Sequence, residues 1–155
     1  MQIGIVVYSQ TGNTLGVCEK LRERLIGDGN AVELERVTVV GERTSKTKTL
    51  ELEKRPDVSA YDAVIFASYV EAFSLCQVMA RYLKEMGSLE GKQIACLVTQ
   101  QFPFPWMGGN RAIGQMKKIC ASKGATIRAT GIVNWAKSRR EKTMAAAVSQ
   151  LSKAF

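Results

Sequence analysis

The sequence predicts a three-layer α/β fold, in which a five-stranded parallel sheet carries helices on both faces. Two observations lead to this fold class. Apolar segments of strand length alternate along the chain with amphipathic helical patterns. The first segment, residues 2–8 (QIGIVVY), is apolar almost throughout, which is typical of a parallel strand buried on both faces. The chain of 155 residues has the length of one ordinary domain, so we expect residues 1–155 to form a single domain.

Each further element follows from its own local pattern. A first helix is expected up to about residue 27, because Val17, Leu21 and Leu25 recur at helical spacing between charged residues. Residues 31–37 alternate between apolar and polar side chains, as an edge strand does. Residues 38–59 are polar and charged, so we expect a mobile connection with a short helix near residues 50–54. The remaining predicted strands are residues 62–68, 92–100 and 125–134, and the remaining predicted helices are residues 73–86, 110–122 and 138–154.

Composition excludes several classes of chemistry. The chain has no histidine, so a histidine-based triad and the usual zinc sites are excluded, and we expect any chemistry to come from a bound cofactor. The four cysteines have no C-x-x-C spacing and apolar neighbours, which predicts reduced thiols in the core. They are Cys18, Cys76, Cys96 and Cys120.

The N-terminal sequence gives an expectation about location. The apolar run at the start is short and no basic stretch precedes it, so it fits neither a signal peptide nor a membrane span. We therefore expect a cytoplasmic protein without a membrane span.

Three loops follow the carboxyl ends of the central strands, where ligands bind in sheets of this type. They are residues 9–14, 68–73 and 99–110. The first, SQTGNT, places small hydroxyl and amide residues between a buried strand and a helix. Free backbone N–H groups and the helix dipole make such a turn suitable for a phosphate. The alternative is that Asn13 or Thr14 only caps the helix.

The spacing of SQTGNT separates it from other phosphate loops. It is neither G-x-G-x-x-G nor G-x-x-x-x-G-K-[ST], which disfavours a dinucleotide held by this turn or a Mg-nucleoside triphosphate. It fits [ST]-x-T-G-x-T and so resembles the phosphate loop of flavodoxins. This resemblance implies a flavodoxin-like fold with strand order 2-1-3-4-5 and one non-covalently bound FMN. It implies that the phosphate binds at Ser9, Gln10, Thr11, Gly12, Asn13 and Thr14.

The resemblance also assigns roles to the other two loops. In flavodoxins the second loop touches the flavin ring, and the third stacks an aromatic side chain on it. We expect Trp106 or Phe102 to stack, while the alternatives are that Tyr69 and Phe73 belong to the core and that the third loop only folds over it. Residues 69–73 lack the glycine that flavodoxins often have there. The implied ring-binding residues are Ser68, Tyr69, Val70, Glu71, Thr99, Gln100, Phe102, Trp106, Gly108 and Gly109.

Charge is distributed unevenly along the chain. The net charge is +8, and residues 91–155 contain 11 Lys or Arg against the single acid Glu141. This basic half is either a solvated face, a docking surface for an acidic redox partner such as a ferredoxin-type protein or an acidic flavoenzyme, or a nucleic-acid surface. The last is disfavoured because no nucleic-acid-binding motif accompanies the charge. The candidate surface comprises residues 134–142 with Lys117, Lys118, Lys123 and Arg128. Electropositive surroundings favour reduction of a flavin. We expect the reduction potential of the hydroquinone couple to be less negative than in acidic flavodoxins. Potentiometric titration would check this.

The resulting functional prediction is an electron-transfer flavodoxin that shuttles electrons between redox partners. An alternative from another class is an FMN-dependent NAD(P)H:quinone-type oxidoreductase, in which the aromatic loop forms a pocket for a second substrate. A third is an interaction module of the same fold that binds no flavin. The three differ in the visible spectrum of the protein. An oxidoreductase would be bleached by NADPH alone, an electron carrier would keep its flavin colour without a separate reductase, and the interaction module would be colourless.

Overall fold

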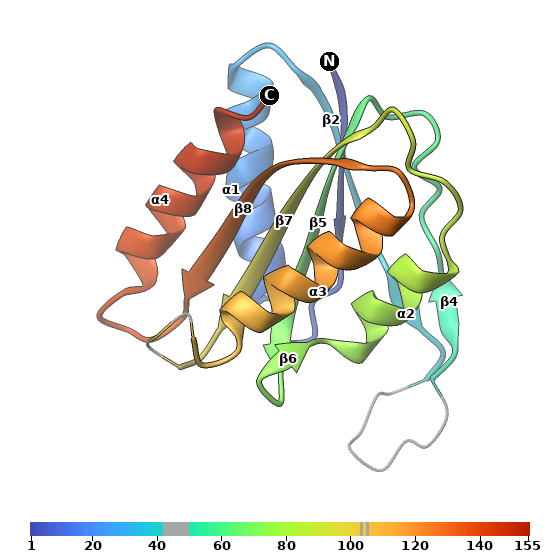
Figure 1. The fold of residues 1–155 in the computed structure, drawn as a ribbon. Helices are drawn as coiled ribbons and strands as arrows, with labels where there is room; N and C mark the ends of the chain where they lie inside the picture. The colour runs from blue at the N-terminus through green and yellow to red at the C-terminus, as the bar shows by residue number, and fades with distance from the viewer. Residues whose placement is uncertain (42–49, 103, 105) are drawn as a thin grey trace.

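The main sheet joins five parallel strands in the order β2-β1-β5-β7-β8 (Figure 1). The computed structural model describes residues 1–41, 50–102, 104 and 106–155. Numbered by their sequence order within this sheet, the five strands follow 2-1-3-4-5, so the predicted order is confirmed. The strands are β1 (Gln2–Val7), β2 (Ala31–Arg36), β5 (Ala63–Glu71), β7 (Gln93–Gln100) and β8 (Thr126–Asn134).

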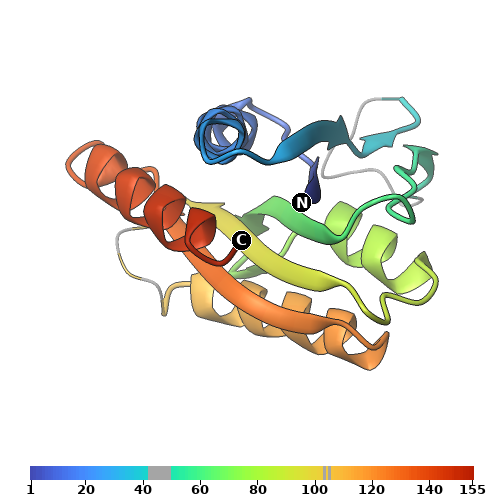
Figure 2. The ribbon, with the colours of Figure 1, turned by 90° about the horizontal axis from the view of Figure 1, so that it is seen from above.

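Within the described residues, two helices cover each face of the sheet, which gives the three predicted layers (Figure 2). Helices α1 (Asn13–Gly27) and α4 (Arg140–Ser152) pack on one face against Ile3, Ile5 and Val7. Helices α2 (Gln77–Glu85) and α3 (Gly109–Ser122) pack on the other face against Val6 and Phe66. Neighbouring β1 residues therefore point to opposite cores, and each of these five side chains is fully buried.

The edge strand β2 behaves as its alternating sequence predicts. Val32 is buried, whereas Ala31 and Glu33 on either side of it are exposed. Because β2 pairs only with β1 among the described residues, one of its edges faces away from the sheet.

The connection after β2 differs from the prediction. Strands β3 (Thr38–Val39) and β4 (Leu52–Lys54) pair antiparallel, so the short helix predicted near residues 50–54 is wrong. Leu52 is buried in the core while Glu51 and Glu53 are exposed, which is the two-residue period of a strand. The mobile connection was predicted partly for residues 42–49, which lie outside the described residues.

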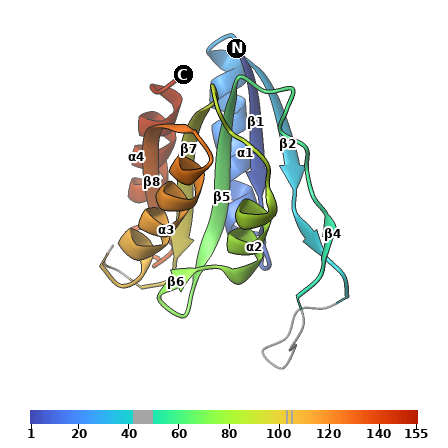
Figure 3. The ribbon, with the colours of Figure 1, turned by 45° about the vertical axis from the view of Figure 1, so that its right-hand side comes forward.

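The segment after β5 also differs. The predicted helix 73–86 begins instead at Gln77, because β5 continues to Glu71 and turns back into the short antiparallel strand β6 (Ser74–Leu75). Figure 3 shows the chain turning from β5 into β6. Ala72 and Phe73 form this turn with φ of 48° and 62°, the left-handed region that suits a two-residue turn. The hairpin carries Phe73 outward, where the side chain is 52% exposed, so Phe73 is not a core residue.

All four cysteines are buried and free, as predicted for core thiols. In the described part of the chain, no helix combines the length and apolar content that a membrane crossing requires.

Candidate functional site

The carboxyl ends of β1, β5 and β7 meet at one edge of the sheet, together with the residues that follow β1 and β7. They line one cavity of about 110 Å³, here named the carboxyl-end cavity. Each of the three loops singled out in the sequence contributes to its wall. The lining residues are Gln10, Thr11, Asn13, Thr14, Tyr69, Val70, Thr99, Gln100 and Gln101.

The first loop is organised around the hydroxyl of Ser9. The Ser9 Oγ accepts hydrogen bonds from the backbone N–H of Gly12 at 3.1 Å and of Leu15 at 3.4 Å. Gly12 has φ of 91°, which a residue with a Cβ adopts only at a cost. The N-cap residue of α1, Gly12, has no side chain to cap the helix, and Ser9 Oγ accepts from the first turn only at Leu15 among the described residues. The N–H groups in the first turn at Asn13 and Thr14 therefore carry the positive end of the helix dipole to the cavity wall.

Two hydrogen bonds tie the first loop to the other two. The hydroxyls of Thr14 and Thr99 are 2.8 Å apart and buried, and this bond joins the first loop to the end of β7. The Tyr69 hydroxyl donates to Gln10 Oε1 at 3.1 Å and so joins the second loop to the first. The Tyr69 and Tyr8 ring centroids are 5.8 Å apart.

Tyr69 remains a hydrogen-bond donor over the physiological pH range. Burial raises its pKa above the ordinary tyrosine value, and the neighbouring Cys76 and Glu71 raise it further. Its hydroxyl also approaches Glu71 Oε2 at 3.5 Å. Burial likewise raises the pKa of the Cys76 thiol, which is therefore a neutral group beside this site.

The third loop is held by one side chain. Gln100, the last residue of β7, donates from Nε2 to the carbonyl oxygens of Phe102 and Phe104, both at 2.7 Å. In the described part of the chain its Oε1 is buried and receives no hydrogen bond. A Cβ on Gly109 would lie 2.4 Å from that oxygen, so the absence of a side chain at Gly109 makes room for Gln100.

Four exposed aromatic side chains surround this end of the molecule, and we call them the aromatic rim. Phe73 and Phe102 stack with ring centroids 5.2 Å apart, and Phe104 and Trp106 stack at 5.7 Å. The Arg139 guanidinium lies 5.5 Å from the centroid of the Phe104 ring. The Phe73–Phe102 stack brings the second and third loops into direct contact.

Gly108 lies at a second point of contact between these loops. A Cβ there would be 2.6 Å from Val70 Cγ1 and 2.9 Å from Phe73 Cα, and φ is 119°. A side chain at this position would therefore push the two loops apart.

The structure brings half of the predicted site residues into one cavity and distributes the others around it. Of the remainder, Ser9 and Ser68 are buried behind the wall, while Phe102 and Trp106 stand on the rim. Glycines 12, 108 and 109 shape the backbone, and Glu71 lies beside Tyr69.

Sequence reasoning missed three residues near this site. Arg36, at the end of β2, donates to the Ser9 carbonyl at 3.4 Å and places a cation beside the first loop. Gln101 lines the cavity, and Phe73 belongs to the aromatic rim. Arg36 was predictable in part, because the end of a strand adjacent to β1 must lie beside the loop that follows β1.

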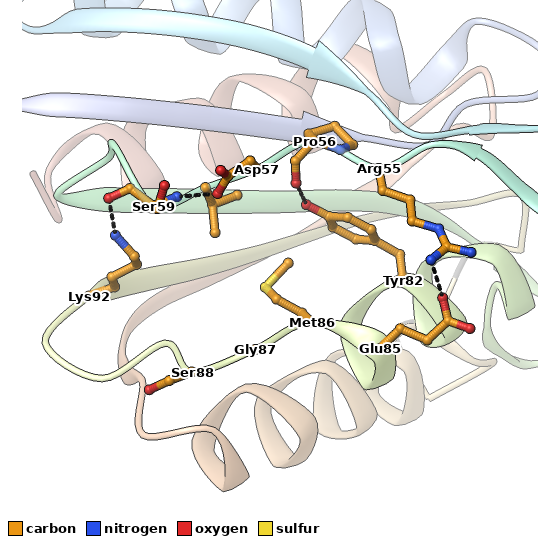
Figure 4. Close-up of a pocket in the computed structure, with 11 residues that line it drawn as sticks. Arg55, Pro56, Asp57, Ser59, Tyr82, Glu85, Met86, Gly87, Ser88 and Lys92 are labelled. Carbon is orange, nitrogen blue, oxygen red and sulfur yellow. Dashed lines mark hydrogen bonds and ion pairs between the residues drawn. The ribbon is translucent and has the colours of Figure 1, made fainter.

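A larger cavity lies at the opposite, amino ends of β5 and β7, and we name it the amino-end cavity (Figure 4). Its volume is about 440 Å³. Arg55 and Glu85 form an ion pair at 3.6 Å across its wall. The lining residues are Arg55, Pro56, Asp57, Val58, Ser59, Tyr82, Glu85, Met86, Gly87, Ser88 and Lys92.

The principal polar groups of the amino-end cavity bind one another, as the dashed lines in Figure 4 show. The buried Tyr82 hydroxyl donates to the Pro56 carbonyl at 2.6 Å. Lys92 Nζ donates to the carbonyls of Ser59 at 3.1 Å and Tyr61 at 2.6 Å. These bonds fasten the chain before β5 to α2 and to the start of β7, so the cavity wall is a structural clamp.

Comparisons with known proteins agree with this architecture. No protein-family model and no curated protein sequence matches the chain. Among solved structures, a flavodoxin of Streptococcus pneumoniae TIGR4 is 18% identical, with 100% of both chains covered and a TM-score of 0.69. Flavodoxin 2 from Bacillus cereus is also 18% identical, covers 99% of this chain and 97% of its own, and has a TM-score of 0.72.

A third solved structure is a short-chain flavodoxin associated with a non-canonical PDU bacterial microcompartment. It is 15% identical, covers 100% of this chain and 99% of its own, and has a TM-score of 0.65. At these identities the likeness establishes the fold. The resemblance to flavodoxins found in the sequence is therefore confirmed as a flavodoxin-like fold.

Proposed function

We propose that this protein binds one FMN without covalent attachment and carries electrons between redox partners. The observation that carries the proposal is the carboxyl-end cavity, to which all three loops of the flavodoxin resemblance contribute. Ligands in open α/β sheets bind at this edge, where the strand order reverses between β1 and β5.

The chemistry of the residues present fits the phosphate and sugar-alcohol parts of FMN. The hydroxyl of Thr11, the amide of Asn13 and the N–H groups at the start of α1 are donors for a phosphate. Arg36 adds positive charge behind the same loop. The buried Gln100 Oε1 is an acceptor of the kind that pairs with a ligand hydroxyl.

The ring end of FMN would meet aromatic side chains. A cavity of about 110 Å³ takes a phosphate and a short polyol, whereas a three-ring system needs further room. Tyr69 lines the cavity, and the Phe73–Phe102 stack fills the space between the second and third loops. We therefore expect this stack to part when FMN binds.

In this proposal Ser9, Gln10, Thr11, Gly12, Asn13 and Thr14 hold the phosphate. Ser68, Tyr69, Val70, Glu71, Thr99, Gln100, Phe102, Trp106, Gly108 and Gly109 surround the ring. Bound FMN would supply the reversible uptake and release of electrons. The chain's own residues then bind, orient and tune it, and Tyr69 keeps its proton because of its raised pKa.

The first experiment is equilibrium dialysis of the purified protein against FMN, followed by anaerobic addition of NADPH. Uptake of one FMN per chain without bleaching by NADPH is the expected result. Bleaching by NADPH alone would instead favour the NAD(P)H:quinone-type oxidoreductase. Failure to take up FMN would overturn the proposal and leave an interaction module of the same fold.

A pair of matched variants tests where FMN binds. Thr11→Asp places a negative charge in the first loop, and we expect it to weaken FMN binding about tenfold or more by repelling the phosphate. Ser88→Asp makes the same charge change in the amino-end cavity, also at an exposed position, and should leave the affinity unchanged. Equal effects of the two substitutions would contradict the assignment of the site.

A further inference from the structure

The molecule combines exposed aromatic surface and positive charge at the carboxyl ends of its strands, and within the described residues that charge forms no ion pair. Phe104 and Trp106 are 42% and 72% exposed. Three exposed cations stand at the same end, and we call them the basic rim: Arg111, Lys137 and Arg139.

The topology explains why these cations gather there. Arg111 lies in the first turn of α3, which follows β7, and Lys137 and Arg139 lie between the end of β8 and the start of α4. All three therefore follow the carboxyl ends of adjacent strands. The Trp135 N–H donates to the Gln100 carbonyl at 2.7 Å, which holds the β8–α4 connection against the base of the third loop.

Within the described residues, no ion pair neutralises these cations. The ion pairs there join Arg24 to Asp28 and Glu85 to Arg55 and Arg81, and none includes a member of the basic rim. Glu141 lies at the same end, in the first turn of α4, and is the single acid among residues 91–155, against 11 cations. At this end the second loop adds only Glu71, which is half-buried beside Tyr69.

We propose that the basic rim, together with Phe104, docks the acidic face of a redox protein. This inference rests on the proposed function, because the docking surface borders the cavity assigned to FMN. Opposite charges speed encounter and set orientation, while an exposed aromatic side chain supplies apolar contact area. The partner fitted by this surface is thus a protein with a cluster of carboxylates around its own electron-transfer site.

The geometry favours an acidic protein over a nucleic acid. Strands of nucleic acid bind along extended basic grooves with aromatic faces open for stacking. Here Phe104 and Trp106 stack on each other with an interplanar angle of 5°, and Arg139 lies over the Phe104 ring. The Phe104 ring and one face of Trp106 are therefore already in contact with protein groups.

The test uses the FMN-loaded protein and defined probes in calorimetric titrations at low and at physiological ionic strength. The probes are an acidic plant-type [2Fe–2S] ferredoxin, a basic cytochrome c and a single-stranded deoxyoligonucleotide. We expect the ferredoxin to bind, with an affinity that falls as salt rises, and the cytochrome not to bind. Preference for cytochrome c, or binding of the oligonucleotide that is tighter than binding of ferredoxin, would overturn the proposal.

Two charge reversals locate the surface. Arg139→Glu should weaken ferredoxin binding about fivefold or more, whereas Arg128→Glu should change it less than about twofold. Arg128 makes a matched control, because it is also an exposed arginine but lies near the amino end of β8. Equal effects of the two reversals would show that ferredoxin binding depends on the overall charge of the protein and not on this surface. That result would overturn the proposed surface.

The affinity for FMN, measured separately on the same variants, separates this proposal from the proposed function. Arg139→Glu should leave FMN affinity unchanged. If the chain took up no FMN but still bound ferredoxin through Arg139, the electron-carrier proposal would fail and the docking surface would stand. If FMN bound normally and no ferredoxin bound, the docking surface alone would fail.

Discussion

The carboxyl-end cavity has a volume of about 110 Å³, and the amino-end cavity at the other end of the same strands about 440 Å³. The larger cavity has polar groups that bind one another and fasten elements together, as Tyr82 and Lys92 do. The smaller cavity is surrounded by hydroxyls, amides and helix N–H groups from all three loop segments. Its buried acceptor Gln100 Oε1 receives no hydrogen bond from a described residue. Volume alone is therefore a poor guide to function, and the state of the polar groups distinguishes the two.

The largest expected effect is a difference in stability between two glycine-to-alanine variants, one beside each cavity. Gly108→Ala should lower the free energy of unfolding by about 2–4 kcal/mol, because its Cβ would overlap Val70 and Phe73 at a left-handed φ. Gly87→Ala, in the amino-end cavity, should change it by less than about 0.5 kcal/mol, since no described residue other than its chain neighbours has an atom within 4 Å of the added Cβ. Urea unfolding of both variants measures the contrast, and similar losses would contradict it.

The next effect concerns the bond between the first and third loops. Thr14→Val should cost about 2 kcal/mol of stability, because it leaves the buried Thr99 hydroxyl without its partner. The double variant Thr14→Val/Thr99→Val should recover much of that loss, since neither hydroxyl is then buried alone. Chemical denaturation of all three variants gives the coupling energy, and additive losses would show that the two hydroxyls do not depend on each other.

A smaller effect is expected from the clamp at the amino end. Tyr82→Phe removes the hydrogen bond to the Pro56 carbonyl and should lower stability by about 1 kcal/mol. FMN affinity, measured by dialysis, should stay the same, because the clamp lies at the far end of the strands. A drop in FMN affinity would contradict the conclusion that the amino-end clamp has no part in FMN binding.

The smallest effect is a dependence on pH at the amino end. The Ser59 N–H donates to Asp57 and holds the pKa of this carboxyl below its ordinary value. The resulting stabilisation is complete above the unfolded-state pKa and is lost as pH falls through the lower folded-state pKa. Asp57→Asn should therefore show a slightly flatter decline of stability between neutral and acidic pH. The effect is small because Asp57 is exposed to solvent.

Most of the fold could be predicted from the sequence because its signals are local. The continuous apolar run of β1 and the alternation of β2 each identify a strand without tertiary information. The β5–β6 hairpin was missed because two-residue turns usually contain glycine or asparagine, which can be recognised in the sequence. Here Ala72 and Phe73 occupy the left-handed positions. Strand β4 was missed because only Leu52 of its three residues is buried.

The site divides in the same way. SQTGNT could be recognised as a loop motif, since its residues are adjacent in sequence. The contacts that complete the site join residues far apart, as in Thr14 with Thr99 and Tyr69 with Gln10. Such pairs depend on the register of β1, β5 and β7, which the order of elements alone does not determine.

The hydrogen bonds from Gln100 restrain the motion of the third loop. Gln100 is the final residue of β7, a strand paired with a parallel neighbour on each side, and its Nε2 holds two carbonyls of the loop. The base of the loop therefore opens only when both of these hydrogen bonds break, so a side chain of the sheet restrains it. Gln100→Ala would remove this restraint, and we expect faster hydrogen exchange of the described loop amides without loss of protection in the middle of β7.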